Sequence, residues 1–182
     1  MNKRAASLRK RRAAVLFMTV LVLLFPAIVT AADNLQIDGT LVNEPCELAP
    51  ESENLTVEFD TIITKYLYIN TRTHAIPLTI KLINCDTTIG ESGWITFTGL
   101  ENEALPGLLS VTGAATGIAV GMELPDGTPL TVNQPSPAFS LLDDATDIVL
   151  QAYIQGEPEA IEKGTITPGD FLATATFEIE YP

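Results

Sequence analysis

The C-terminal segment, residues 171–182, alternates apolar and polar side chains almost without a break. Successive side chains of a β-strand point to opposite faces of a sheet, so the alternation predicts a strand with one buried face. No turn signal follows this segment, and we therefore expect it to lie at a sheet edge whose backbone is a template for another chain. The apolar face is predicted to carry Ala173, Ala175, Phe177, Ile179 and Tyr181.

Strand signals recur along the rest of the chain, separated by clusters of Gly, Pro, Asn and Asp. The predicted strands cover residues 35–42, 55–59, 75–84, 94–100, 117–124, 148–154 and 171–181. The triplet Pro125-Asp126-Gly127 predicts a chain reversal, because Pro presets φ and Gly accepts a positive φ. With no long helix predicted, the pattern is typical of one all-β sandwich domain.

The N-terminal segment, residues 1–31, is predicted to be a cleaved secretory signal peptide. Six Lys and Arg residues lie within its first twelve positions, an apolar run follows over residues 13–27, and small residues then offer two cleavage frames. We expect the mature chain to begin at Ala32 or Asp33. A retained membrane anchor is the alternative, but Pro26 and the short apolar run favour cleavage.

The mature chain is strongly acidic. Removal of the first 31 residues leaves four Lys and Arg against all 23 Asp and Glu, a net charge of −19. Such a surface repels phosphate backbones and anionic lipids, so we expect no nucleic-acid partner. Asp143, Asp144 and Asp147 lack the alternating ligand spacing of a calcium loop, and no metal or cofactor is predicted.

The two cysteines, Cys46 and Cys85, are predicted to form a disulfide because the chain is exported. A loop of roughly 40 residues would stabilise the fold by about 4 kcal/mol on a chain-entropy estimate.

Catalytic motifs are lacking in the sequence, and no enzyme is predicted. The one histidine, His74, is expected in a loop or at a strand edge, because no nucleophile motif such as GxSxG accompanies it. Trp94 is predicted to be a core residue, with exposure as a sugar-stacking platform as the alternative. In this strand Trp94, Thr96 and Thr98 share one face, and Ile95, Phe97 and Gly99 share the other.

A second alternating segment precedes the first cysteine, with Leu35, Ile37, Gly39 and Leu41 on one face. Together with the cysteine pair, Gly169 at the fourteenth position from the end and Tyr181 at the penultimate position, this segment resembles the subunits of chaperone–usher fimbriae. The resemblance covers essentially the whole mature chain. It is greatest to the minor tip-fibrillum subunits of type 1 fimbriae, because about fifteen residues separate the cleavage site from Cys46.

The resemblance implies an incomplete immunoglobulin-like sandwich, the pilin fold, which lacks its last strand and is completed by donor-strand exchange. It implies a signal peptide over residues 1–31, a donor-strand extension over residues 32–43 and a pilin domain over residues 44–182. The implied donor positions are Leu35, Ile37, Gly39 and Leu41. The implied acceptor-groove and chaperone-contact positions are Gly169, Ala173, Ala175, Phe177, Ile179, Tyr181 and Pro182.

The expected function is therefore that of a structural, minor subunit of a surface fimbria that contributes to cell adhesion. The implied partners are a periplasmic pilus chaperone, an outer-membrane usher and neighbouring fimbrial subunits, with export through the periplasm to the cell surface. The alternative is a secreted, self-complete immunoglobulin-like module that binds carbohydrate or a host protein. The two hypotheses differ at the sheet edge beside residues 171–181, which is open only in a pilin.

Overall fold

The computed structural model describes residues 35, 37–39, 41 and 43–182. The chain divides into two units, Met1–Leu41 and Val42–Pro182, and the fold below is that of the second unit. The predicted signal peptide lies outside the described residues, and the predicted strand over residues 35–42 lies partly outside them.

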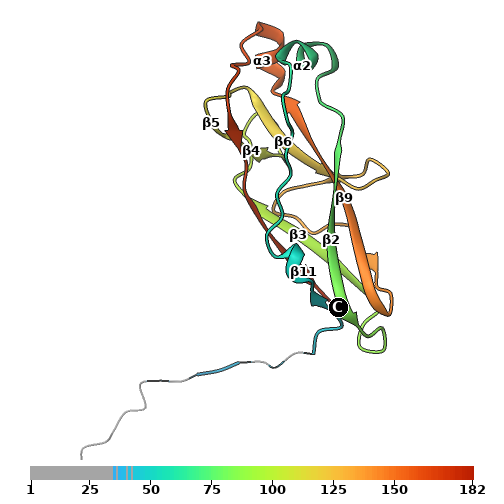
Figure 1. The fold of residues 1–182 in the computed structure, drawn as a ribbon. Helices are drawn as coiled ribbons and strands as arrows, with labels where there is room; N and C mark the ends of the chain where they lie inside the picture. Colours follow the sequence, from blue (N-terminus) through green and yellow to red (C-terminus); the bar gives the residue numbers. More distant parts are fainter. Residues whose placement is uncertain (1–34, 36, 40, 42) are drawn as a thin grey trace, which may run out of the picture. The chain divides into compact units, whose positions relative to one another are not determined.

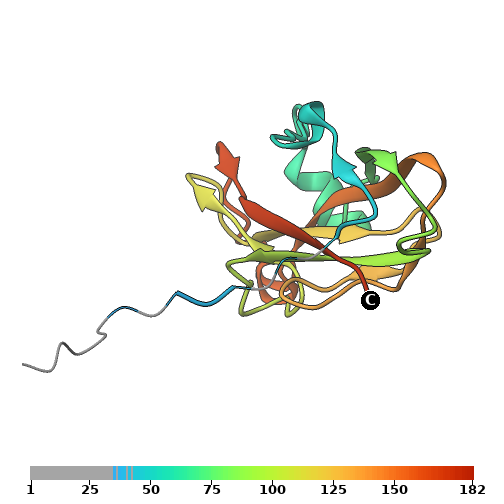
Figure 2. The ribbon, with the colours of Figure 1, turned by 90° about the horizontal axis from the view of Figure 1, so that it is seen from below.

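Two antiparallel sheets form the body of the second unit (Figures 1 and 2). The larger has the order β1-β2-β9-β6-β4, with β7 also on β6, and the smaller has the order β11-β3-β8. β10 and β5 pair with each other in a separate two-stranded ribbon. The bounds in the larger sheet are β1 Glu47–Leu48, β2 Ile76–Cys85, β4 Leu109–Ser110, β6 Ile118–Glu123, β7 Pro129–Leu130 and β9 Asp144–Gly156. The other strands are β3 Ser92–Gly99, β5 Thr112–Gly113, β8 Phe139–Ser140, β10 Phe171–Leu172 and β11 Ala175–Glu180.

The helices are short: η1 Pro50–Ser52, α2 Thr64–Asn70 and α3 Pro158–Lys163. Pro at the first position of α3 fits the helical φ, and Gly164 ends the helix at a φ of 67°. Figure 1 shows α2 and α3 at one end of the unit and the C-terminus at the other. Among the described residues, no helix has the length and apolar character needed to cross a membrane.

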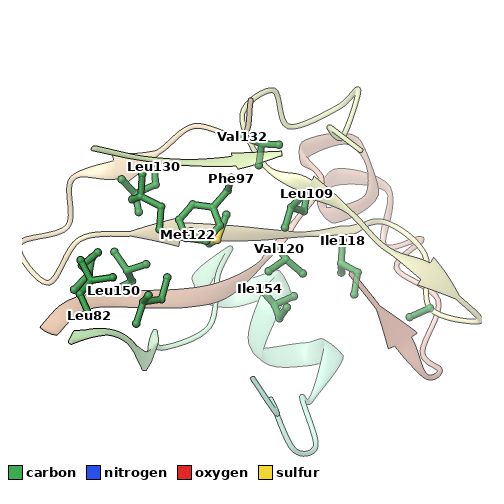
Figure 3. Close-up of a cluster of buried hydrophobic side chains, with 14 of the residues drawn as sticks. Leu82, Phe97, Leu109, Ile118, Val120, Met122, Leu130, Val132, Leu150 and Ile154 are labelled. Carbon is green, nitrogen blue, oxygen red and sulfur yellow. The ribbon is translucent and has the colours of Figure 1, made fainter. Parts of the chain in front are cut away.

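The core lies between the two sheets and consists of the inward-facing residues of each strand. Ile80 and Leu82 of β2, Ile95 of β3, and Leu150 and Ile154 of β9 are all at most 1% exposed. Figure 3 shows how side chains from β2, β3, β4, β6 and β9 meet in this layer. The disulfide between Cys46 and Cys85 is present, as predicted, beside the end of β2.

Most predicted strands are confirmed, with shifted ends: β2, β3, β6, β9, and β10 with β11. The turn at Pro125-Asp126-Gly127 is confirmed too, since the N–H of Leu124 donates to the carbonyl of Thr128 and β7 returns along β6. The C-terminal strand is interrupted at Ala173 and Thr174, because β10 pairs with β5 whereas β11 pairs with β3.

Two predictions are wrong. The segment 55–59 is not a strand, because it has no neighbouring strand with which to form a ladder. Trp94 is not a core residue: it lies half-buried on the outer face of β3, where its Nε1–H donates to the Glu180 carboxylate at 2.7 Å. The predicted faces of this strand are correct, because Ile95 and Phe97 are buried on the inner face.

His74 lies exposed in the loop before β2, as predicted, within hydrogen-bond distance of the Tyr66 hydroxyl. Asp143 accepts hydrogen bonds from the backbone N–H and the hydroxyl of Thr87, which lower the pKa of its carboxyl. This acid therefore joins two loops at the end of the unit opposite α2.

Candidate functional site

A groove of about 770 Å³ opens beside the C-terminal strand of the second unit. One wall is formed by residues 171–177, and the other by residues 53–57 together with Leu48 and Phe59. The floor is apolar and comes from several strands: Leu78, Ile80, Phe97, Leu109, Val120, Met122 and Ala152. Figure 3 shows part of this floor, with Phe97, Leu109, Val120 and Met122 close together.

The wall at β11 has one paired edge and one open edge. Ala175 to Glu180 pair in register with Gly99 to Trp94 of β3, and no other strand of the described residues pairs with β11. Its backbone groups on the groove side thus have no ladder partner in the described chain. An edge of this kind is a template for one more strand.

The wall over residues 54–59 follows an extended course between η1 and α2 in Figure 1 but forms no ladder. Within the described residues, no hydrogen bond engages the backbone of residues 54–59. Exposure alternates toward the end of this wall, because Val57 and Phe59 are half-buried while Glu58 and Asp60 are exposed. The groove is therefore bordered on both sides by extended backbone with unused hydrogen-bonding groups.

The predicted acceptor residues alternate in burial along β11 as expected. Ala173, Ala175 and Phe177 are half-buried and line the groove, and the Phe177 ring lies 6.1 Å from that of Phe97. Ile179 and Tyr181 lie on the same face but beyond the groove itself. Burial raises the pKa of the Tyr181 hydroxyl, and the nearby Glu44 carboxylate raises it further.

Gly169 and Pro182 lie outside the groove. Gly169 stands two residues before β10, and a Cβ on it would lie 2.7 Å from the Cβ of Ala114, so a larger residue would push β10 away from β5. Its neighbour Asp170 accepts hydrogen bonds at its carbonyl from the N–H groups of Ala114 and Ala115. Pro182 is exposed beyond the end of β11.

The predicted donor residues belong to the first unit. Leu35, Ile37 and Leu41 are 76%, 84% and 100% exposed, and nothing lies within 4 Å of a Cβ built on Gly39. Residues 36, 40 and 42 fall outside the described residues.

Sequence reasoning did not find the far wall or the floor. Phe59 stacks at a tilt on Phe171, with ring centroids 6.3 Å apart, and so joins the two walls near one end of the groove. The alternation of Leu55, Val57 and Phe59 was a usable signal, but it predicted an ordinary paired strand. Floor residues carry no signal of their own, because a buried strand residue looks the same beneath a groove as beneath a closed sheet.

Comparison with known proteins shows that the family model "Fimbrial protein" matches residues 35–182. The chain belongs to the fimbrial protein family. A relative in this family is the major MR/P fimbria protein of Proteus mirabilis, 35% identical over 79% of this chain and 80% of its own. The fimbrial adapter PapK of Escherichia coli is 32% identical over 82% of this chain and 88% of its own.

Solved structures support the fold of this fimbrial protein. The P pilus rod subunit PapA superposes with a TM-score of 0.68, at 21% identity, over 76% of this chain and all of its own. The P pilus adaptor subunit PapF superposes with a TM-score of 0.52, at 20% identity, over 76% of this chain and 97% of its own. The predicted incomplete immunoglobulin-like sandwich is thereby confirmed, as is the role of a structural fimbrial subunit that assembles with other subunits at the cell surface.

Proposed function

We propose that the groove of this fimbrial protein receives a β-strand from another polypeptide, and that this exchange is how the subunit enters the fibre. The observation that carries the proposal is the groove itself, with an apolar floor between two extended walls whose facing backbones lack partners. An inserted strand forms main-chain hydrogen bonds with the walls, and every second side chain packs onto the floor.

The occupant in the fibre is the segment 35–42 of a neighbouring subunit. Its apolar residues alternate as the floor requires, with Leu35, Ile37 and Leu41 exposed in the subunit that supplies them. Gly39 lies between these large side chains in the alternation. A glycine at this position allows the incoming backbone to approach the groove closely. Burial of the three large side chains is the driving force, at about 1.5–3 kcal/mol for each full burial.

Before assembly, a strand of a periplasmic chaperone occupies the same groove. An outer-membrane usher then transfers the subunit from the chaperone to the growing fibre. The sequence features that support this route are the signal peptide over residues 1–31 and the extension over residues 32–43 ahead of the domain at 44–182. Gly169, Ile179, Tyr181 and the exposed Pro182 extend the chaperone contact beyond the groove.

The subunit has no catalytic role in this proposal, and its contribution to adhesion is structural. A minor position near the tip is supported by the short segment before Cys46 and by the similarity to the adapter PapK. The open edge of β11 argues against a self-complete binding module, since no strand of the described chain covers it.

Expression of the mature chain in the periplasm, with and without a fimbrial chaperone, tests the proposal. We expect aggregation of the chain alone, rescue as a one-to-one complex, and a higher unfolding temperature with a peptide of residues 33–45. A peptide with Gly39 replaced by Phe is the matched control and should stabilise much less. The proposal is contradicted by an abundant, monomeric chain that forms no complex with the chaperone and whose unfolding temperature does not change with the peptide.

A further inference from the structure

The two ends of the second unit each expose apolar side chains. The helix end, residues 63–74 and 156–167, carries Ile63, just before α2, and Ile69, within α2, which are 68% and 69% exposed. The loop end, residues 84–91 and 141–147, carries Ile89 and Leu142, which are 42% and 64% exposed. Figure 1 shows that β2 and β9 run from one end to the other.

Each end is held together by its own contacts. At the helix end, the N–H of Ile166 donates to the Tyr68 hydroxyl at 3.1 Å, which joins the loop after α3 to α2. At the loop end, the N–H of Leu141 donates to the carbonyl of Glu91 at 2.9 Å. The exposed apolar residues therefore sit on supported surfaces rather than on isolated loops.

The two ends also differ in charge. The helix end holds Lys65, Arg72 and Lys163 together with Glu157, Glu159 and Glu162, so its formal charge is zero. Arg72 pairs with Glu123 and Lys163 with Glu159, whereas Lys65 has no acidic partner among the described residues. The loop end contains no Lys or Arg, and its five acids are Asp86, Glu91, Asp143, Asp144 and Asp147. Two loop ends repel each other, while a loop end and a helix end are electrostatically compatible.

The direction of strand addition selects between these pairings. All strand pairs of the described chain are antiparallel, so a strand added to β11 in the same manner runs from Glu180 toward β10 and finishes at the helix end. β10 pairs with β5, which Figure 1 shows toward the end that carries α2 and α3, so the added strand finishes on that side of the unit. A parallel strand would instead bring two acidic loop ends together.

The neighbour's domain must then follow closely. Only residues 42–45 separate Leu41 from Cys46, and these five Cα-to-Cα steps span at most about 18 Å. Cys46 is bonded to Cys85 at the loop end of its own domain, and the carbonyl of Pro45 accepts the N–H of Asp86 there. The loop end of the incoming subunit therefore faces the helix end of the subunit that receives its strand.

We propose that the helix end and the loop end are the two halves of a second, head-to-tail contact between consecutive subunits. Ile63 and Ile69 of one subunit pack against Ile89 and Leu142 of the next, and Lys65 faces the acidic loops. The contact joins different patches, so it repeats along a fibre instead of closing a dimer. The inference rests on the proposed strand exchange, which fixes where the neighbour lies.

Paired cysteines in assembled fibres test the contact. A chain with Ile69→Cys and Leu142→Cys is made with its chaperone and usher, and the assembled fibres are oxidised. After boiling without reductant, these fibres should give a ladder of disulfide-linked subunits on a denaturing gel. The matched control pairs Ile69→Cys with Val149→Cys, an exposed position on the face of β9 far from either end, and should give no ladder. Fibres of the chain with Ile69→Cys and Leu142→Cys that form but give no ladder overturn the inference.

A binding comparison separates this inference from the strand exchange itself. Ile69→Glu should leave the affinity for a peptide of residues 33–45 within twofold of the wild type, but should weaken binding of a whole second subunit at least tenfold. Val149→Glu should change neither value. Equal affinity of Ile69→Glu and the wild type for the whole subunit refutes the head-to-tail contact alone, whereas failure of the wild type to bind the peptide refutes the strand exchange and the contact together.

Discussion

Replacement of Phe177 by Ala tests whether the groove beside β11 binds a strand. Phe177 lies in the middle of β11, half-buried, with its ring 6.1 Å from that of Phe97. A strand inserted along the open edge of β11 would cover the part of this ring that is exposed in the free subunit. The substitution therefore removes more packing from the filled groove than from the empty one.

The size of the expected loss in strand affinity follows from how deeply the Phe177 ring is buried in the filled groove and in the free subunit. Truncation of a fully buried Phe to Ala costs about 3–5 kcal/mol. For the half-buried ring of the free subunit we expect about 2 kcal/mol, which includes about 0.5–1.5 kcal/mol for the aromatic pair. The difference, about 1–3 kcal/mol, is lost from the free energy of strand binding, and it corresponds to roughly 5- to 150-fold weaker affinity.

Two measurements check this prediction: denaturant unfolding of the free subunit, and titration with a peptide of residues 33–45. Val149→Ala is the matched control, because Val149 is exposed on the outer face of β9, and it should change peptide affinity less than twofold. A Phe177→Ala subunit that is destabilised by about 2 kcal/mol yet binds the peptide as tightly as the wild type would show that the strand binds elsewhere.

Three further predictions concern the body of the subunit. Gly121→Ala should destabilise it by about 1–3 kcal/mol in denaturant unfolding, because the new Cβ collides with the buried Tyr153 ring; unchanged stability would contradict this packing. Reduction of the disulfide should remove about 4 kcal/mol and lower the Tm measured by calorimetry by roughly 10–20 °C, and an unaltered Tm would count against it. Thr87→Val should lower stability at neutral pH, and the deficit should shrink as the pH falls below 3.8. The hydrogen bond from the Thr87 hydroxyl depresses the pKa of Asp143, and its stabilisation is lost once that carboxyl is protonated; a deficit that persists in acid would refute the assignment.

Much of the fold was predictable because strand periodicity is local. The alternation over residues 171–181 correctly separates half-buried from exposed side chains, and β2, β3, β6 and β9 lie where their apolar runs predict. Trp94 was misplaced because alternation assigns residues to two faces but does not say which face is inside. Its outer position depends on β11, which brings Glu180 to its indole N–H.

The groove was predictable only in part. Ala173, Ala175 and Phe177 form one wall, as their shared face suggested, but Ile179 and Tyr181 lie beyond the cavity. Within the far wall over residues 53–57, residues 55–57 were predicted to belong to a paired strand over 55–59. Local sequence cannot reveal that a partner strand is missing.

The sequence by itself determined the β-class of this subunit, its alternating segments, its disulfide and its turn at Pro125-Asp126-Gly127, because each depends on neighbouring residues or on a single pair of cysteines. Tertiary structure alone decided that β11 pairs with β3 on one edge and leaves the other open, and that floor residues from separate strands meet beneath that edge. It also decided which apolar and charged residues gather at each end of the unit. These properties arise from long-range strand pairing, in which each edge is filled or left open by segments far apart in the chain.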